Sequence, residues 1–227
     1  MTARFVLLVV AKAPVPGLAK TRLCPPATPA QAARIAAAAL LDTLDAVCAV
    51  PGAAPVVAMT GDLGSAALAT EIGLALRRVT TIPQRGGDFG ARLVNAHADA
   101  AAVHTGLPVL QIGMDTPQVT PESLAAAVAP VLHGGHDSVL GPAVDGGWWA
   151  LGLAEPRHAQ VLAGVPMSRD DTGIRTLRAL VASGLRPSGA ARLSDVDTMA
   201  DARSVAAACP DGRFARAVAA VRGRAVA

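Results

Sequence analysis

The sequence has no tyrosine, and aromatic residues make up only 2% of its 227 residues. Proteins that hold single-stranded nucleic acid often stack bases on aromatic rings, so this scarcity argues against a nucleic-acid-binding protein. The charge argues the same way, because 20 lysines and arginines nearly balance 17 acidic residues and form no basic run. The net charge of +3 suits a small anionic ligand better.

Long hydrophobic runs are missing too, although 52% of the residues are hydrophobic. The longest runs, Phe5–Ala11 and Ile35–Leu41, hold seven residues each, whereas a membrane-spanning helix needs about 20. The three cysteines are scattered and form no CxxC pair, so neither a disulfide framework nor a zinc site is expected. The segment around Phe5–Val10 resembles a minimal signal peptide, but its shortness favours a buried first strand. We therefore expect a cytoplasmic protein without a membrane span.

Short apolar runs alternate with helical patterns along the chain. The runs are rich in Val, Leu and Ile and bounded by Gly or Pro, which is typical of buried strands. They lie at Arg4–Val10, Pro55–Thr60, Arg77–Ile82, Pro108–Gly113, Asp137–Leu140 and Trp148–Leu153. Helix starts are marked by capping residues, at Thr28, Thr120, Ser168 and Thr198, and a further helix is expected over about Asp88–His104.

This alternation predicts an α/β fold of three layers, with helices on both faces of a mostly parallel, Rossmann-like sheet. Neither a linker nor an internal repeat interrupts the pattern, so we expect one domain over residues 1–227. In such sheets, ligands bind beyond the carboxyl ends of the strands. The residues that follow each predicted strand are therefore the candidates for a functional site.

The loop after the first predicted strand carries the most informative motif. It runs from Lys12 to Leu23 and combines two prolines and a glycine with the cations Lys12, Lys20 and Arg22. A stiff loop that offers backbone N–H groups, ammonium groups and a guanidinium suits a polyphosphate. A solvated basic loop is the alternative, but three cations at the carboxyl end of a strand favour anion binding.

Carboxylates gather at two other positions. Asp115 follows a predicted strand, while Asp195 and Asp197 lie two residues apart in an extended segment and therefore on one side of it. Mg²⁺ prefers such oxygen ligands, and a shared cation would offset the repulsion between the carboxylates. The alternatives are an Asx-turn at Asp115 and a helix N-cap at Asp197 or Thr198.

Two glycine-rich segments could approach a ligand closely. In Gly141–Trp149, Asp145 could serve as a base or bind an acceptor hydroxyl, and the alternative is an Asp-Gly hairpin turn. One of its two tryptophans is expected in the core, because adjacent strand residues face opposite ways. In Gln84–Leu93 the glycines could admit a base or sugar, with Arg92 one turn into a helix, and the alternative is a flexible connector.

In this order, the motifs resemble the GT-A-like "transferase 1, radical-SAM/selenodomain-associated" family, which is itself similar to 2-phospho-L-lactate guanylyltransferase. The resemblance covers nearly the whole chain, from Lys12 to about Asp201. Its motifs are found at Lys12–Leu23, Gly87–Arg92, Gly113–Pro117, Gly141–Gly147 and Asp195–Thr198.

The resemblance implies a GT-A fold and a set of site residues. Catalytic roles would fall to Lys20, Arg22 and Asp145. Nucleotide and phosphate binding would fall to Lys12, Pro16, Gly17, Lys20, Thr21, Arg22, Gly87, Asp88 and Arg92. The acceptor would lie against Gly146, Gly147, Trp148 and Ser168, and the metal, Mg²⁺ or Mn²⁺, would be held by Asp115 and Asp197.

The reaction implied is nucleotidyl transfer from a nucleoside triphosphate to a small phosphorylated or carboxylated acceptor. Catalysis would consist of positioning and charge neutralisation by the metal and the loop cations. Two alternatives stay open, namely a glycosyltransferase that uses a nucleotide sugar and a non-catalytic nucleotide-binding domain. The expected partners are a nucleotide and a small-molecule acceptor but no nucleic acid, and the chain could form a homodimer.

Overall fold

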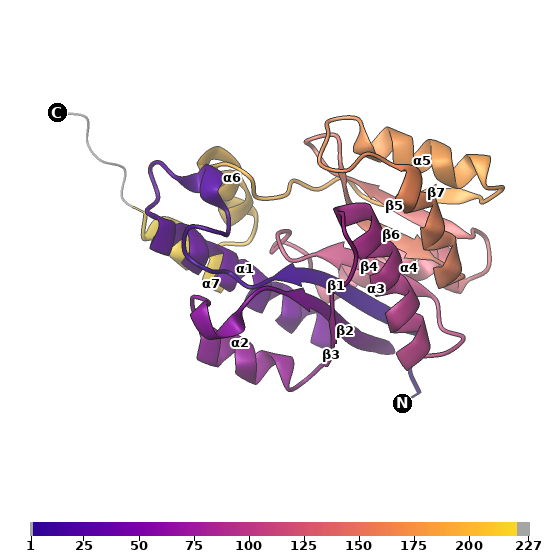
Figure 1. Cartoon of the computed structure of the whole chain (residues 1–227), viewed down its shortest axis with the longest axis horizontal. Coiled ribbons are helices and arrows are strands. Elements are labelled where there is room, and N and C mark those ends of the chain that lie inside the picture. The colour runs from indigo at the N-terminus through magenta and orange to yellow at the C-terminus, as the bar shows by residue number, and fades with distance from the viewer. Residues whose placement is uncertain (1, 222–227) are drawn as a thin grey trace.

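The chain folds around a seven-stranded sheet, seen in a computed structural model that describes residues 2–221 (Figure 1). The strand order is β3-β2-β1-β4-β6-β5-β7, and β6 alone runs antiparallel to its neighbours. The strands are β1 Phe5–Lys12, β2 Ala53–Thr60, β3 Thr80–Pro83, β4 Val109–Gly113, β5 Ser138–Pro142, β6 Trp148–Leu153 and β7 Pro187–Gly189.

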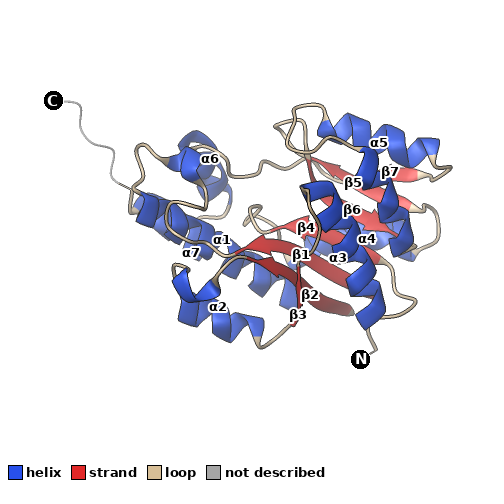
Figure 2. Ribbon diagram, in the orientation of Figure 1, coloured by secondary structure: helices blue, strands red, loops and turns tan. Residues whose placement is uncertain are grey.

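Helices cover both faces of the sheet (Figure 2). The α-helices are α1 Pro29–Cys48, α2 Ala69–Leu76, α3 Phe89–Val103, α4 Pro121–Leu132, α5 Thr172–Ala182, α6 Met199–Ala208 and α7 Arg213–Ala219. Short 3-10 helices are η1 Thr21–Leu23, η2 Leu63–Ser65 and η3 Pro156–Gly164. One core packs α1, α2 and α4 against one face, and a second packs α3, η3 and α5 against the other. This confirms the predicted three-layer α/β fold.

Helix α1 has two buried faces, which explains why its sequence is so rich in alanine. One face, with Leu40 and Leu44, packs on the sheet. The other, with Ile35, packs on α6 and α7 in a third core that also contains Phe214. A helix covered on both sides needs apolar residues nearly all round. As a result, the C-terminal helices α6 and α7 lie beside α1 at one end of the molecule, away from β5 and β7 (Figure 1).

Three of the predicted helix starts are confirmed. Thr28, Thr120 and Thr198 are the N-caps of α1, α4 and α6, and each forms a capping box. The prediction at Ser168 is wrong. Its φ of 58° is left-handed, and α5 begins at Thr172, with Asp171 at the N-cap position. The S-x-x-D spacing there belongs to a bent loop instead of a cap.

The six predicted strands are present, and the largest shift of a boundary is in the third. The segment Arg77–Val79 ends helix α2 and turns, so the third strand begins only at Thr80. Neither α2 nor β7 is predicted from the sequence, because α2 is short and β7 has three residues without a strong apolar pattern. The first apolar run is the buried strand β1, as predicted. Among the helices of residues 2–221, none combines the length and the hydrophobicity that a membrane-spanning segment requires.

Candidate active site

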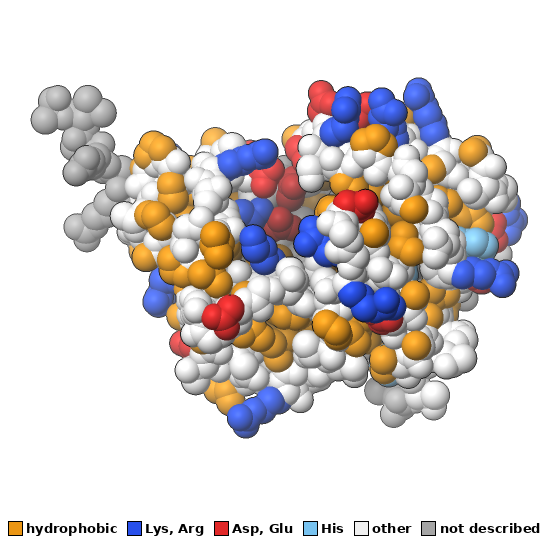
Figure 3. Space-filling view, in the orientation of Figure 1, with side chains coloured by type: hydrophobic (Ala, Val, Ile, Leu, Met, Phe, Trp, Pro, Cys, Tyr) orange, Lys and Arg blue, Asp and Glu red, His pale blue; other side chains and the backbone are white. Residues whose placement is uncertain are grey.

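An open cleft of about 850 Å³ lies beyond the carboxyl ends of β1, β2 and β4. Figure 3 shows it as a hollow in which acidic side chains face lysines and arginines. Its walls include the loop after β1, the turn between β5 and β6, and the loop before α5. The segment that runs from β7 to α6 borders the cleft as it crosses between the two halves of the molecule (Figure 1).

Most of the predicted site residues line this one cleft. They are Lys12, Lys20, Thr21, Arg22, Arg92, Asp115, Asp145, Gly147, Trp148, Ser168 and Asp197. Five others, Pro16, Gly17, Gly87, Asp88 and Gly146, are not among the lining residues. Of these, Asp88 is the N-cap of α3, where its carboxylate accepts a hydrogen bond from the N–H of Ala91 at 2.7 Å. The structure thus brings together residues from five separate motifs.

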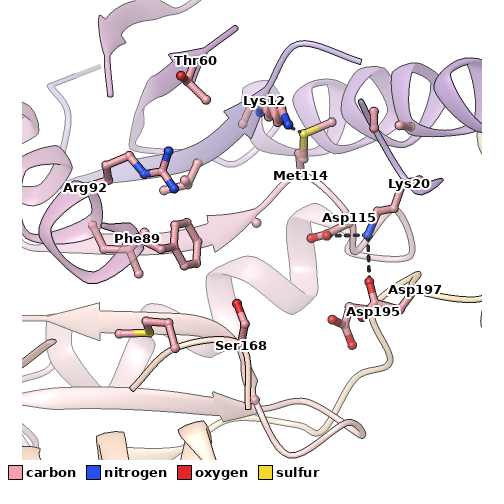
Figure 4. Close-up of a pocket in the computed structure, with 18 of the residues that line it drawn as sticks. Lys12, Lys20, Thr60, Phe89, Arg92, Met114, Asp115, Ser168, Asp195 and Asp197 are labelled. Carbon is pink, nitrogen blue, oxygen red and sulfur yellow. Dashed lines mark hydrogen bonds and ion pairs between the residues drawn. The ribbon is translucent and has the colours of Figure 1, made fainter. Parts of the chain in front are cut away.

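Lys20 lies between two of the carboxylates that the sequence assigns to a metal. Its Nζ donates to Asp115 Oδ2 at 2.7 Å and to Asp197 Oδ1 at 3.3 Å (Figure 4). Burial opposes the lysine charge, but Asp115 and then Asp197 more than compensate and raise the pKa of Lys20. Arg22 reaches Asp197 as well, at 3.1 Å from its Nη1. In this structure, two of the loop cations neutralise carboxylates.

Three carboxylates come close enough to share one cation. Single oxygens of Asp145, Asp195 and Asp197 all lie within 4.8 Å of one another. Burial, together with the negative charges of Asp145, Asp115 and Asp197, raises the pKa of Asp195 to about 6. This cluster differs from the predicted pair, because it contains Asp145 and Asp195 and does not contain Asp115. The predicted metal roles of Asp115 and Asp197 and the catalytic role of Asp145 stay predictions.

Backbone contacts fix the position of the acidic segment. The N–H of Val196 donates to the carbonyl of Asp115 at 3.2 Å, which ties the segment to the end of β4. Val196 itself is buried. Because side chains alternate along an extended chain, Asp195 and Asp197 share the opposite side and face the cleft.

The glycines of the β5–β6 turn hold the loop before α5 in place. Gly146 has a φ of +90°, and a Cβ there would overlap the carbonyl oxygen of Asp170. The N–H of Gly173, at the start of α5, donates to the carbonyl of Gly146 at 2.8 Å. These contacts set Asp145 beside Ser168–Asp170 on the wall of the cleft. The predicted hairpin turn is therefore present, and its role in shaping the cleft is compatible with the functional interpretation.

The two tryptophans divide as predicted. Trp149 is buried in the core and its Nε1 donates to the carbonyl of Ala191 at 2.8 Å. Trp148 lines the cleft, with its Nε1 donating to Thr176 Oγ1 at 3.1 Å. Because its N–H is already bonded to Thr176, Trp148 presents mainly an apolar surface to the cleft.

On the other side of the cleft, Arg92 extends from the first turn of α3 (Figure 4). Its Cζ lies 5.6 Å from the centre of the Phe89 ring, a cation–π distance. Gln84 lies nearby in sequence, just after β3, and its amide donates to the carbonyls of Ala11 and Ala58 at 2.8 and 2.9 Å. Gln84, Phe89 and Arg92, from the segment for which a flexible connector was the alternative, therefore line the cleft.

Gln84 and Gln111 are among the polar cleft residues to which sequence reasoning gives no site role, and Asp195, a candidate metal ligand from its spacing, is not in the predicted metal pair. Gln84 and Asp195 lie within recognised motifs. Gln84 also directly follows a strand, so it could have been found by the strand-end rule, that ligands bind beyond the carboxyl ends of the strands. Gln111 gave no signal, because a polar residue inside a predicted strand indicates only a partly exposed face.

Solved structures of other proteins share the fold of this chain. A candidate nucleotide-diphospho-sugar transferase from Desulfovibrio desulfuricans G20 has a TM-score of 0.82 at 24% identity, covering 97% of this chain and 94% of that one. CMP:2-keto-3-deoxy-manno-octonic acid synthetase in complex with CTP has a TM-score of 0.58 at 12% identity, covering 92% and 99%. Rv0371C of Mycobacterium tuberculosis in complex with manganese has a TM-score of 0.51 at 19% identity, covering 90% and 98%. These likenesses confirm the fold.

Sequence comparison gives the family. The chain is 34% identical over 122 residues to phosphoenolpyruvate guanylyltransferase of Nocardia farcinica (strain IFM 10152). The match spans about half the length of each protein, 52% of this chain and 52% of the relative. The relatives found are thus named as transferases, in agreement with the expected resemblance. A family model matches residues 43–169, more than half of the chain, and this protein therefore belongs to the family of uncharacterized proteins conserved in bacteria named DUF2064.

Proposed function

We propose that this protein is a metal-dependent nucleotidyltransferase. It would transfer a nucleotidyl group from a nucleoside triphosphate to a small phosphorylated or carboxylated acceptor. An acceptor oxygen would attack the α-phosphorus, and pyrophosphate would leave. The observation that carries the proposal is one cleft, at the carboxyl ends of parallel strands, where the cations of the first loop meet a cluster of carboxylates.

The donor set suits a hard divalent cation. Asp145, Asp195 and Asp197 offer carboxylate oxygens within reach of one ion, and Mg²⁺ and Mn²⁺ prefer such ligands together with phosphate oxygens. These three residues would hold the ion, whose charge would neutralise the charge that develops on the phosphates. The manganese in the Rv0371C structure adds support for Mn²⁺ as well as Mg²⁺.

The loop cations would hold the phosphates. Lys12, Lys20 and Arg22 come from one loop and line the same cleft as the acidic cluster. In the proposed complex, the ammonium of Lys20 and the guanidinium of Arg22 would turn toward phosphate oxygens while the metal neutralises the carboxylates. The exposed Arg22 side chain can do so without moving the backbone.

The name of the Nocardia relative suggests the first substrates to test, GTP and phosphoenolpyruvate. Phosphoenolpyruvate is both phosphorylated and carboxylated and so fits the expected acceptor class. We expect the protein to release pyrophosphate only when GTP, the acceptor and Mg²⁺ or Mn²⁺ are all present. Release with a different nucleoside triphosphate would support the same reaction with a different nucleotide base.

A matched pair of variants tests the acidic cluster. Asp197→Asn should lower the rate of pyrophosphate release about 100-fold or more, because it removes charge from the centre of the site. Asp62→Asn is the control, since Asp62 caps η2 outside the cleft, and it should react like the wild type. Equal rates in both variants would contradict the proposed site. Stabilisation by nucleotide sugars but by no triphosphate would favour glycosyl transfer instead.

A further inference from the structure

The cleft has a buried amide on its floor. Gln111 lies in the middle of β4, in register with Leu8 of β1 and Leu151 of β6, and is only 2% exposed. Burying a polar group in such apolar surroundings costs free energy unless its hydrogen bonds are made. Gln111 nevertheless lines the cleft, so part of its amide faces the space that a ligand would fill.

His97 holds one end of this amide. The ring Nε2 of His97, on α3, lies 2.9 Å from Gln111 Oε1, and His97 is fully buried. Its other nitrogen, Nδ1, is buried without a hydrogen-bond partner in residues 2–221. An unpaired buried N–H is rarer and more costly than an unpaired lone pair, so the proton should lie on Nε2. Burial lowers the pKa of His97 to about 4, which keeps the ring neutral at ordinary pH.

This arrangement fixes the orientation of Gln111. If His97 donates to Oε1, the amide nitrogen of Gln111 must point away from the ring. In the part of the chain that the structure describes, the Gln111 side chain makes no second hydrogen bond. Its N–H groups are therefore left for a ligand in the cleft.

The surroundings indicate which part of a ligand lies there. Leu93, Trp148 and Met167 line the cleft and also pack on the core beneath α3, so they form apolar walls. Such walls suit the carbon skeleton of a small acid better than a triphosphate. Arg92, which precedes His97 on α3 and also lines the cleft, adds a positive charge for an acidic group.

We propose that Gln111 donates a hydrogen bond to an oxygen of the acceptor, and that His97 is the positioning residue that fixes the direction of this amide. The inference rests on the proposed function, because it assigns the acceptor to this side of the cleft. It places the acceptor between Gln111 and Arg92, opposite the acidic cluster.

The ring tautomer of His97 provides a test that needs no turnover. Long-range ¹H–¹⁵N spectra of the ligand-free protein should show the proton on Nε2 and a bare Nδ1, with the signal assigned by its loss in His97→Phe. A proton on Nδ1 would mean that the amide is turned around and presents its oxygen to the cleft. That result would overturn the inference and leave the proposed reaction untouched.

Ligand titration tests the assignment to the acceptor. The side-chain amide signal of Gln111, identified by its absence in Gln111→Leu, should shift when phosphoenolpyruvate is added to the Mg²⁺–GTP complex. It should shift little when Mg²⁺–GTP is added alone. A large shift with Mg²⁺–GTP alone would place the nucleotide there and refute the proposal.

Kinetics separates positioning from a merely structural role. Gln111→Leu and His97→Phe should each raise KM for phosphoenolpyruvate about 10-fold, the cost of one hydrogen bond, while KM for GTP stays the same. His97→Gln can still donate to Gln111 and should restore most of the affinity. Loss of thermal stability with an unchanged acceptor KM would overturn the inference. If the wild type releases no pyrophosphate with any pair, the proposed function fails first, and the acceptor role of Gln111 fails with it.

Discussion

Lys20 occupies the site where the proposed metal and phosphates would bind. Its replacement should therefore lower the stability of the metal-free protein and raise the stabilisation that a metal gives. Replacing Lys20 by Met keeps most of the side-chain length and removes the charge. Without metal, Asp115 and Asp197 would then lose their shared cation and repel each other and their acidic neighbours. With metal, the same variant would lose a competitor for the carboxylates. Lys20→Met should therefore be less stable than the wild type without metal but gain more stability from Mn²⁺.

The distances give the magnitude. At an effective dielectric constant of about 20, charges 2.7 and 3.3 Å apart attract by about 6 and about 5 kcal/mol. Most of this attraction is offset by desolvation, since the Lys20 side chain is only 15% exposed. Exposed pairs contribute up to about 1 kcal/mol, and breaking a buried pair costs about 3–5 kcal/mol. The carboxylates here are about one-third exposed, so we expect a loss of about 2 kcal/mol.

Urea unfolding measures both effects, the loss of stability in the presence of a chelator and the gain of stability on addition of Mn²⁺. The control is Arg85→Met, which breaks an ion pair of 2.6 Å with Asp99 on the protein surface, outside the cleft. Arg85→Met should leave both stability and the response to Mn²⁺ nearly unchanged. Wild-type stability of Lys20→Met without metal would refute the proposed electrostatic role. A smaller gain from Mn²⁺ than in the wild type would show that Lys20 does not compete with the ion.

Two further predictions concern the framework of the site. The pKa of His97 is about 4 when folded and about 6.5 when unfolded, so the unfolded chain binds more protons between these values. The contribution of neutral His97 to the free energy of unfolding should therefore be fully present above pH 6.5, and about 3 kcal/mol of it should be lost as the pH drops to 4. In His97→Gln, a plot of unfolding free energy against pH should be flatter over this range. Gly146→Ala should cost more than about 3 kcal/mol in urea unfolding, because left-handed strain adds to the overlap with Asp170. Gly134→Ala, with a φ of +75° and open space around it, should cost only about 1–2 kcal/mol, and equal losses would refute the packing argument.

Much of the fold follows from short-range signals in the sequence. Capping boxes at Thr28, Thr120 and Thr198 mark helix starts correctly, because a cap depends on residues within one turn. Buried parallel strands are recognised by continuous apolar runs such as Phe5–Ala11 in β1. The prediction at Ser168 fails because the same spacing occurs in a loop whose shape is set by a distant contact, the packing of Gly146 against Asp170.

The strand-end rule predicts which residues approach the site, but it does not predict how their charges pair. From the sequence, Lys20 is a phosphate ligand and Asp115 a metal ligand. In the structure they bind each other, because three segments far apart in the chain converge on one point. The meeting of Asp145 with Asp195 and Asp197 is supported by a backbone hydrogen bond between their segments, from the N–H of Val144 to the carbonyl of Leu193 at 3.0 Å. No local pattern encodes such contacts, so the residue types could be predicted while their pairing could not. Under the proposed function, a metal ion would replace Lys20 beside the carboxylates, and Lys20, which stabilises the acidic side chains when no ligand is bound, would then be available to bind phosphate.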